Sequence, residues 1–502
     1  MSAMPRVLLV NPSMTSARNA RFPLAILSLG AALDGQCETE LLDGNVQRDF
    51  VARAVGAAQA GRVDLLAVSV MGGPQLPTAI TLSKAVRAAA PAVPIVWGGA
   101  FPTNCPEATL VGGYVDYAVS AQGEQTLTEL VRLLRTPGAC PSTIAGLSWR
   151  RGATVHHNAE RTFSAASLAQ RLPYERLERP ERYLKPTFLG QRTVAYQAAL
   201  GCRFRCTFCG VATMFRGRMA LPSAARLEQD LHFFKTEYGA DAVQFYDHNF
   251  FDREVDMVPL LEVLARLQLP WWCFARSDAL VNLSASSWEL VRRSGLRMAY
   301  IGAESPSDWM LHEVRKGTRT DQTLAAVEAC HAHGVVPELS FMLAPPHDPE
   351  GETERTFEFI RHIKERFPRT EIMLYVYTPL PPRPGSSVRR ARPDLKLRDA
   401  DGGAVRFPQS AEEWALPQWQ RYWCHTDAPW LSARLRRRIR DFSIVLGCRY
   451  PTLIDIRSPA WGKRALRALA SWRYHFRRYR NPWELDLSRR VLRLHDPRIS
   501  SL

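Results

Sequence analysis

Three cysteines in one short segment constrain this chain more than any other feature. Cys202, Cys206 and Cys209 stand in the sequence Gly-Cys-Arg-Phe-Arg-Cys-Thr-Phe-Cys-Gly, and the next cysteine along the chain is Cys273. At a C-x3-C-x2-C spacing, the three thiolates can reach one small metal cluster only if this segment folds as a tight loop. A [4Fe–4S] cluster normally takes four cysteine ligands, so three leave one iron open to a cofactor or substrate. The spacing therefore predicts an iron–sulfur cluster with one open iron.

A zinc site and a disulfide framework both fit these cysteines less well. A structural zinc site needs a fourth Cys or His at a matching spacing, and His232 and His248 lie too far along the chain. A disulfide framework is typical of short secreted chains, whereas this chain has 502 residues and ten scattered cysteines. The first residues predict a β-strand rather than a secretory signal. We therefore expect a cytoplasmic protein whose thiols stay reduced and free to bind metal.

The first 140 residues alternate apolar strands with helical stretches. Each strand runs into a turn, a pattern that predicts a doubly wound parallel sheet for residues 1–140. Ligands bind such sheets at the carboxyl ends of the strands, so we expect these turns to form one rim. The predicted strands are 7–10, 40–43, 64–70, 94–97 and 117–120.

A second α/β unit is predicted for residues 191–395, after a linker at 141–190 that carries a small hairpin. Its first strand runs directly into the cysteine loop, and helical stretches separate the later strands. Six strands in βα order predict a partial (β/α)6 barrel rather than a closed barrel of eight units. The predicted strands are 193–200, 243–246, 271–274, 298–301, 337–343 and 372–377.

The positive charge of the chain is concentrated at its C-terminal end. The formal net charge is +16, and the residues from Ser386 onward hold 25 Lys and Arg against 11 Asp and Glu. Residues 396–502 are predicted to form a mostly helical basic domain. Its apolar residues at helical spacing favour a helix that packs on the barrel with a solvated basic face. These residues are Leu466, Leu469, Trp472 and Phe476, with Arg473, Arg477 and Arg480 beside them.

Contact with a membrane surface is the main alternative for this basic region. Under this alternative, the working hypotheses are that the substrate is acidic or membrane-associated and that the protein lies at the membrane periphery. Nucleic acid is not an expected partner, because no recognition module accompanies the charge. The sequence contains no uncharged apolar run long enough to span a bilayer.

The cysteine loop resembles that of the radical S-adenosylmethionine enzymes. The resemblance implies that Cys202, Cys206 and Cys209 hold the cluster, that its open iron chelates S-adenosylmethionine, and that Phe208 lies near the adenine. It also implies reductive cleavage to a 5′-deoxyadenosyl radical that removes a hydrogen atom from a substrate. An external one-electron reductant of the flavodoxin or ferredoxin type is then required.

Further contacts to S-adenosylmethionine are implied at the ends of the later barrel strands. Such positions usually carry the site residues of a barrel. By the resemblance, Asp247 would bind the amino group, Arg276 would pair with the carboxylate in a forked geometry, and Glu304 would accept from the ribose hydroxyls. Ser340 and Leu343 would contact the adenine.

The N-terminal sheet resembles the cobalamin-binding domain that precedes the barrel in one large radical subfamily. The matching segments are Phe22-Pro-Leu-Ala-Ile-Leu-Ser-Leu, Leu42-Asp-Gly-Asn, Trp97-Gly-Gly-Ala-Phe-Pro-Thr and Gln122-Gly-Glu-Gln-Thr-Leu. Glycine permits a close backbone approach to a flat macrocycle. No histidine precedes His156, so this domain offers no imidazole to the lower face of the cobalt. The implied cobalamin contacts are Asn11, Ser69, Met71, Gly98, Gly99, Gly123 and Glu124.

Together these resemblances predict a cobalamin-dependent radical S-adenosylmethionine methyltransferase. It would methylate an unactivated carbon of a small-molecule substrate, by hydrogen abstraction followed by methyl transfer from methylcobalamin. Some members of the subfamily instead cyclise, contract rings or oxidise without moving a methyl group, and nothing in the sequence fixes this choice.

Two further alternatives are less favoured. A methylthiotransferase should have three more cluster cysteines in its N-terminal domain, and Cys37, Cys105 and Cys140 do not form such a pattern. A zinc-stabilised scaffold that binds acidic polymers is the non-enzymatic alternative.

Overall fold

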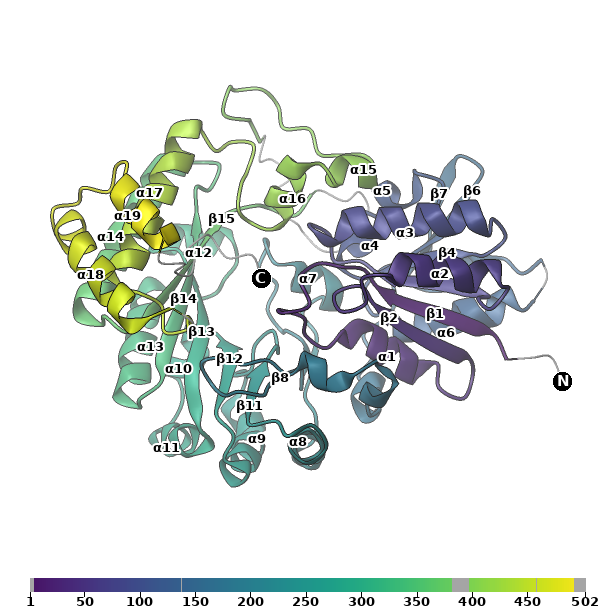
Figure 1. Cartoon of the computed structure of the whole chain (residues 1–502), viewed down its shortest axis with the longest axis horizontal. Helices are drawn as coiled ribbons and strands as arrows, with labels where there is room; N and C mark the ends of the chain where they lie inside the picture. The colour runs from purple at the N-terminus through teal and green to yellow at the C-terminus, as the bar shows by residue number, and fades with distance from the viewer. Residues whose placement is uncertain (1–3, 137, 382–396, 457, 492–502) are drawn as a thin grey trace.

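Two β-sheets lie side by side in this protein, and helices cover their outer faces (Figure 1). The computed structural model describes residues 4–136, 138–381, 397–456 and 458–491. The N-terminal sheet forms one end of the molecule, and the second sheet with the C-terminal helices forms the other (Figure 1).

The N-terminal sheet has the strand order β2-β1-β3-β4-β5-β6-β7, and the five strands from β1 to β5 are parallel. Every residue of β3 is buried, because helices cover both faces of the sheet. The predicted doubly wound sheet is confirmed. Its parallel strands are β1 (Arg6–Asn11), β2 (Glu38–Asp43), β3 (Leu65–Ser69), β4 (Ile95–Gly98) and β5 (Tyr117–Val119).

Helices pack on the two faces of this sheet in separate groups. One face carries α1 (Leu24–Ala32) and α6 (Glu124–Leu134), which contact each other, and the other carries α2 (Phe50–Gln59) and α3 (Gln75–Ala89) (Figure 1). The short helices α4 (Ala100–Asn104) and α5 (Pro106–Leu110) follow β4.

The hairpin that we assigned to the linker belongs to the N-terminal sheet. Its strands β6 (Leu147–Arg151) and β7 (Thr154–His157) are antiparallel, and β6 pairs with β5. Without this hairpin, β5 would expose a row of backbone hydrogen-bonding groups, which is a general liability of edge strands. The sheet therefore continues past residue 140, where we placed its end.

The rest of the linker joins the two sheets through aromatic packing. It contains the 3-10 turns η1 (Pro141–Thr143), η2 (Ala166–Ala169), η3 (Tyr174–Arg176) and η4 (Pro180–Tyr183). The Phe22 ring lies 5.0 Å from the Tyr183 ring and 5.9 Å from that of Phe234, a barrel residue. The Tyr183 hydroxyl also donates a hydrogen bond to Asp43 Oδ2 (2.9 Å). These buried contacts hold the two domains in one arrangement.

The second sheet consists of six parallel strands in the order β15-β14-β13-β12-β11-β8, which confirms the predicted partial barrel. The strands are β8 (Thr193–Tyr196), β11 (Ala242–Phe245), β12 (Trp271–Ala275), β13 (Leu296–Glu304), β14 (Val336–Leu343) and β15 (Glu371–Val376). The helices of this domain are α8 (Ala224–Tyr238), α9 (Glu254–Leu267), α10 (Ser277–Val281), α11 (Ala285–Ser294), α12 (Asp308–Glu313), α13 (Thr320–Ala332) and α14 (Pro349–Arg366).

The cysteine segment begins after a break in the first barrel strand. The strand predicted at 193–200 ends at Tyr196, and a two-residue strand β9 (Leu200–Gly201) pairs with β10 (Met219–Ala220). Helix α7 (Gly210–Phe215) starts directly after the last cysteine of the motif. The three cysteines therefore lie in a loop that β9, β10 and α7 enclose.

The described part of the C-terminal region is mostly helical, and its helices divide into two groups. Helices α15 (Ala411–Trp414) and α16 (Pro417–Trp423) lie on the N-terminal domain, where the Trp423 ring packs against Gly72. Helices α17 (Ala433–Arg449), α18 (Ala460–His475) and α19 (Trp483–Val491) form a group at the far end of the barrel (Figure 1). None of the helices in the described part of the chain has both the length and the hydropathy of a membrane span.

Candidate active site

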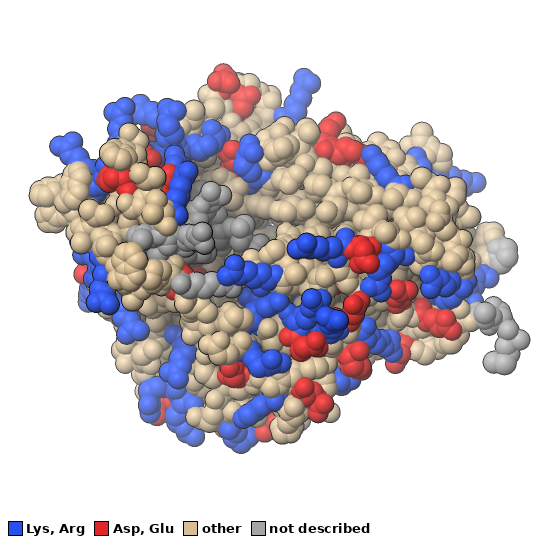
Figure 2. Space-filling view, in the orientation of Figure 1, with Lys and Arg blue, Asp and Glu red and all other residues tan. Residues whose placement is uncertain are grey.

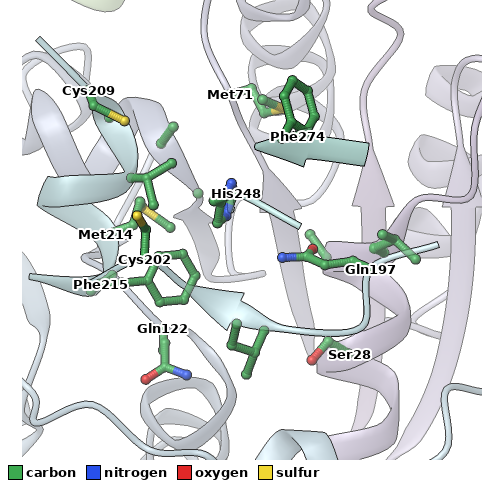
Figure 3. A pocket seen from close by; sticks show the side chains of 18 of the residues that line it. Ser28, Met71, Gln122, Gln197, Cys202, Cys209, Met214, Phe215, His248 and Phe274 are labelled. Atoms are coloured by element: carbon green, nitrogen blue, oxygen red, sulfur yellow. The ribbon is translucent and has the colours of Figure 1, made fainter. Parts of the chain in front are cut away.

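A single cavity of about 780 Å³ lies between the carboxyl ends of the two sheets. The turns after β3, β4 and β5 line one side of it, and the cysteine loop with the ends of β8, β11, β12 and β13 lines the other. Residues of the linker, α1, β14 and β15, together with His425, also contribute to the wall. Figure 3 shows side chains from both domains directed into this space. A volume of this size is at the upper end of the range for small-molecule sites.

All three predicted cluster ligands, Cys202, Cys206 and Cys209, line this cavity. Their loop is held by backbone hydrogen bonds, from Thr207 N to Val314 O (3.0 Å) and from Cys209 N to Cys206 O (3.2 Å). Gly201 has a φ of +80°, and a Cβ on it would lie 2.2 Å from Arg218 O, so only glycine fits at the loop entrance. The donor set and its rigid loop fit a cluster with three protein ligands.

The environment of these thiols favours their protonated form when no metal is present. Burial raises the pKa of Cys202, and it raises the pKa of Cys209 to about 12. A bound metal displaces such protons, because the thiolate is the ligand. In the described part of the chain, no three His, Cys, Asp or Glu side chains are arranged to hold a single metal ion.

Arg276 and Phe208, two of the predicted cofactor contacts, both lie in the cavity wall. The guanidinium of Arg276 stacks over the Phe204 ring, 3.5 Å from its centroid, and pairs with Asp278 through two hydrogen bonds of 3.0 Å. It also donates to Lys316 O (2.6 Å). The fork that we predicted for a cofactor carboxylate is thus already engaged by Asp278. In this structure Arg276 fixes the cysteine loop through Phe204.

Glu304 also lines the cavity, and it forms a buried ion pair that the sequence did not predict. Lys316 Nζ donates to Glu304 Oε1 at 2.7 Å, and both side chains are less than a tenth exposed. Glu304 has a φ of +63°, next to a register shift between β13 and β14. The irregular backbone at the end of β13 turns this carboxylate toward Lys316 and the cavity.

Asp247 is not part of the cavity wall. Its carboxylate accepts hydrogen bonds from the backbone N–H groups of Ala198 (3.2 Å) and Ala199, and its side chain is buried. Burial raises the pKa of Asp247 to about 7, although both N–H donors favour the ionised form. We predicted a contact to the amino group of the cofactor, but the structure shows a clamp that holds the segment entering the cysteine loop.

The two predicted adenine contacts on β14 have different positions. Ser340 lines the cavity together with Met342, whereas Leu343 is fully buried elsewhere. Successive residues of a strand point to opposite faces, so Leu343 must point away when Ser340 and Met342 point inward. The side chain of Leu343 therefore packs in the core.

Six of the seven predicted cobalamin residues line the opposite side of the cavity. Asn11 is the exception, because its amide donates to Asp43 Oδ1 (2.8 Å) and accepts from Gln75 Nε2 (2.9 Å). It joins β1 to β2 and α3 and does not reach the cavity. The six residues in the wall are Ser69, Met71, Gly98, Gly99, Gly123 and Glu124.

The glycine turns on this side form a smooth backbone surface. Gly99 has φ +103° and ψ −164°, a conformation that is essentially restricted to glycine. A Cβ there would lie 2.7 Å from Val70 O, so the β3 and β4 turns touch at this point. A flat macrocycle can approach such a surface closely, and the residues present therefore fit cobalamin.

Several cavity residues were missed by sequence reasoning. His248 follows Asp247 at the end of β11, and its ring projects into the cavity, as does the side chain of Gln197 (Figure 3). Tyr300 donates a hydrogen bond to the Tyr375 hydroxyl (2.8 Å), and both rings line the wall. Lys316 and His425 are two further examples. The positions of His248 and Gln197 after strand ends could have indicated their place, whereas the others depend on long-range packing.

Two family models match the chain in the order that the architecture requires. A B12 binding domain model matches residues 13–131, and a radical SAM superfamily model matches residues 196–360. The first match covers β2 to β5 of the N-terminal sheet, and the second covers the cysteine loop and the barrel strands β11 to β14.

Curated relatives include enzymes of two kinds. An uncharacterised methyltransferase of Pyrococcus horikoshii is 26% identical over 289 residues, which cover 57% of this chain and 61% of the relative. The chain thus spans about three fifths of the length of that relative. The anaerobic magnesium-protoporphyrin IX monomethyl ester cyclase of Synechocystis sp. is 22% identical over 370 residues, or 72% of each chain.

Solved structures share much of this fold at low sequence identity. The radical S-adenosylmethionine methyltransferase TsrM of Kitasatospora setae, with cobalamin and a [4Fe–4S] cluster bound, has a TM-score of 0.61 and 18% identity, covering 93% of this chain and 99% of TsrM. The cobalamin-dependent radical enzyme OxsB with aqua-cobalamin has a TM-score of 0.60 and 19% identity, covering 71% of this chain and 52% of OxsB. The protein is a cobalamin-dependent radical S-adenosylmethionine enzyme, and its cofactors are a [4Fe–4S] cluster, S-adenosylmethionine and cobalamin.

Proposed function

We propose that this enzyme is a methyltransferase that acts on an unactivated carbon of a small-molecule substrate. The observation that carries the proposal is the shared cavity, which the three cysteines and the glycine turns line from opposite sides. A substrate held in this cavity would face both cofactor sites at once, so it would not have to move between the two steps. The methyltransferase relatives support the same activity.

The two cofactor systems supply the reactive chemistry, namely hydrogen abstraction on the cluster side and the methyl group on the cobalamin side. The chain supplies binding, orientation and a dry environment. Apolar residues such as Leu29, Val119, Phe274 and Met342 line the cavity between the two ends. Such a wall excludes water, which prevents a reactive substrate from being consumed by side reactions.

His248 is the polar group best placed to contact the substrate. More than a third of its surface is open to the cavity, and in the described part of the chain no hydrogen bond fixes its imidazole. Desolvation by the cavity walls lowers the pKa of His248 to about 4, so the ring is neutral at physiological pH. A neutral imidazole can accept a hydrogen bond from the substrate or take up one proton. We assign His248 the role of orienting the substrate.

The same proposal assigns roles to the predicted site residues and domains. Residues 1–140 together with the β6–β7 hairpin bind cobalamin, and residues 191–395 hold the cluster and S-adenosylmethionine. Ser69, Met71, Gly98, Gly99, Gly123 and Glu124 would contact cobalamin; Phe208, Arg276, Glu304 and Ser340 would surround S-adenosylmethionine. An external reductant of the flavodoxin or ferredoxin type would supply single electrons.

A cyclisation or oxidation without methyl transfer is the second candidate function. It is favoured by the extent of the match to the cyclase of Synechocystis, which covers 72% of both chains. The cavity offers the same substrate position in either case.

Labelled S-adenosylmethionine distinguishes the two functions. The anaerobically reconstituted enzyme, with cobalamin and a reductant, is incubated with methyl-labelled S-adenosylmethionine and an extract of the host cell. Methyl transfer predicts a small-molecule product that carries the label and appears together with 5′-deoxyadenosine. An unlabelled product that has lost hydrogen, formed with 5′-deoxyadenosine, would refute the methyltransferase proposal and support the second candidate.

His248→Gln provides a test of the substrate-orienting role. This substitution leaves the cluster loop and the glycine turns untouched, so 5′-deoxyadenosine should still form without substrate. Labelled product should fall at least tenfold relative to the 5′-deoxyadenosine formed. An unchanged ratio would show that His248 does not orient the substrate.

A further inference from the structure

The exposed apolar side chains of this protein are concentrated near its C-terminal end. Seventeen large hydrophobic residues of the described chain are exposed, and ten of them lie between Leu453 and Val491. Single exposed hydrophobic residues are ordinary on a protein surface, but a cluster marks an interaction site. Three of the ten precede α18 and the others lie on or directly after α18 and on α19, at the end of the molecule opposite the N-terminal sheet (Figure 1).

Helix α18 has two apolar faces instead of one. Leu466, Ala470 and Tyr474 form the buried face that packs into the protein. The members of the second face are exposed and lie three, four or eight residues apart, which places them on one side of the helix. These members are Trp461 (63% exposed), Leu469 (48%), Trp472 (51%) and Phe476 (65%).

We predicted that this helix packs on the barrel through its apolar residues, and the prediction holds for Leu466 alone among the four named residues. Helix α19 repeats the pattern with Trp483, Leu487 and Val491, spaced four residues apart and all more than half exposed. The two helices contact each other. We call the exposed apolar residues of α18 and α19, including Phe476 directly after α18, the C-terminal apolar face.

Basic residues predominate in the segment that carries the C-terminal apolar face. Residues 460–491 contain nine Lys and Arg against two Asp and Glu. Arg464 and Arg467 are exposed on α18, and neither forms an ion pair within the described residues. The space-filling view shows basic side chains gathered over this end of the molecule, next to uncharged surface (Figure 2).

Arg473 and Arg477 differ from these residues, because both are engaged in the fold. Arg473 pairs with Glu484 and donates to the backbone carbonyls of Arg478 (2.9 Å) and Arg480 (3.1 Å), so it fixes the turn between α18 and α19. Arg477 pairs with Glu358 of α14 at 2.9 Å. The charge available to a partner therefore comes from other residues, among them Arg464, which lies three residues after Trp461 and flanks the C-terminal apolar face.

We propose that the C-terminal apolar face docks onto an anionic membrane surface. A helix with Trp, Phe and Leu on one face and Arg or Lys beside it lies in the plane of the lipid headgroups. The aromatic rings sit at the level of the headgroups, and the basic side chains attract anionic lipid. This docking is separate from the chemistry of the cavity and does not depend on the proposed methyl transfer.

The charge pattern favours lipid over a second copy of the chain. A second copy would bring an equally basic surface against this one, and like charges across an interface oppose association. An anionic bilayer supplies the opposite charge and accepts apolar side chains at the same time. An anionic bilayer therefore matches both the exposed apolar side chains and the basic side chains near them.

Vesicle flotation of the full-length protein tests this proposal. One set of vesicles contains equal parts of phosphatidylglycerol and phosphatidylcholine, and the other contains phosphatidylcholine alone. We expect binding to the anionic vesicles that weakens as salt is added, and much weaker binding to the neutral vesicles. Absence of binding to the anionic vesicles at low salt would overturn the proposal.

Substitutions then separate the apolar contribution from the basic one. The double variant Trp472→Ser with Phe476→Ser should lose more than about tenfold in binding to both kinds of vesicle. Arg464→Gln should lose about fivefold on anionic vesicles, which is the contribution of about one basic residue near the surface, and should lose nothing on neutral ones.

The matched control is Trp309→Ser. Trp309 is also 51% exposed, like Trp472, but it lies on α12 of the barrel. Its substitution should leave vesicle binding unchanged, and a loss equal to that of the Trp472 variant would refute the assigned face. Light scattering gives a second check, since a dimer that the double variant converts to monomer would assign this face to self-association. All variants replace exposed side chains, and unchanged melting temperatures would show that they fold.

Discussion

Replacement of Gly99 by alanine should destabilise the N-terminal domain strongly. The residue joins β4 to α4 at φ +103° and ψ −164°, where an L-residue is strained. A backbone conformation of this kind costs of the order of 1–3 kcal/mol for a residue other than glycine. The new Cβ would also lie 2.7 Å from Val70 O and 3.2 Å from Val70 N, so the β3 turn would have to move.

The strain and the displaced turn together predict that the free energy of unfolding falls by about 2–4 kcal/mol. For a domain of this size, that loss corresponds to a fall in melting temperature of roughly 5–15 °C. The matched control is Gly98→Ala, because a Cβ on Gly98 meets only Val119 Cβ, at 3.8 Å. Both glycines line the cavity, so the pair separates backbone strain from a simple added methyl group.

Calorimetry measures the loss of stability, and cobalamin titration measures the loss of cobalamin affinity. In the cofactor-free protein, Gly99→Ala should lower the first unfolding transition while Gly98→Ala leaves it within about 1–2 °C of the wild type. Cobalamin affinity, followed by absorbance, should fall most for Gly99→Ala, since the β3 and β4 turns that face the cavity are displaced. Equal stability of the two variants would refute the argument from backbone geometry.

Three other substitutions test the site. Lys316→Met should cost about 3–5 kcal/mol of stability, because it leaves the buried Glu304 carboxylate without its partner, and adding Glu304→Gln should recover most of the loss in chemical denaturation. Burial lowers the pKa of His425 to about 4, below its unfolded value of about 6.5, so the folded state binds fewer protons and stability falls as the pH drops through this window. The wild type should therefore lose about 2 kcal/mol more between pH 7 and pH 5 than His425→Gln does, and equal pH profiles would contradict this origin. Asp247→Asn places an N–H group opposite a backbone N–H of the segment Ala198–Ala199, so it should lower the free energy of unfolding by about 1–3 kcal/mol. It should also lower the amount of iron retained after reconstitution. Full retention of iron would contradict the role of Asp247 as a clamp.

The architecture could be predicted from the sequence because its signals are local. Each strand of the two parallel sheets is a short apolar run that ends at a turn, and the cysteine spacing specifies a cluster loop without any tertiary information. The β6–β7 hairpin was recognised but assigned to the linker, since pairing between Tyr117 and Trp149 spans a long sequence separation. The sheet edge that a hairpin joins depends on the unpaired backbone N–H and C=O groups that the edge would otherwise expose.

The site was predicted less completely, for reasons of geometry. Strand ends identified Arg276 and Glu304, but their partners Asp278 and Lys316 follow from how loops pack. A strand end does not reveal which way a side chain turns. Asp247 turns back to the neighbouring strand end, whereas His248, the next residue, enters the cavity.

The C-terminal helices show the same limit in another form. Helical spacing placed Leu466, Leu469, Trp472 and Phe476 on a single apolar stripe. The structure divides this stripe between a buried face and an exposed one, because α18 contacts its neighbours along only part of its circumference. Burial of the stripe could not be inferred from periodicity alone.

The central claim is that one chain holds a three-cysteine cluster with an open iron that binds S-adenosylmethionine. Anaerobic reconstitution of the wild type and of Cys202→Ala, Cys206→Ala and Cys209→Ala, followed by measurement of iron and of 5′-deoxyadenosine after reduction, tests it directly. The wild type should bind about four irons per chain and release 5′-deoxyadenosine, and each variant should lose both. Formation of 5′-deoxyadenosine at the wild-type rate by any of the three variants would contradict the account.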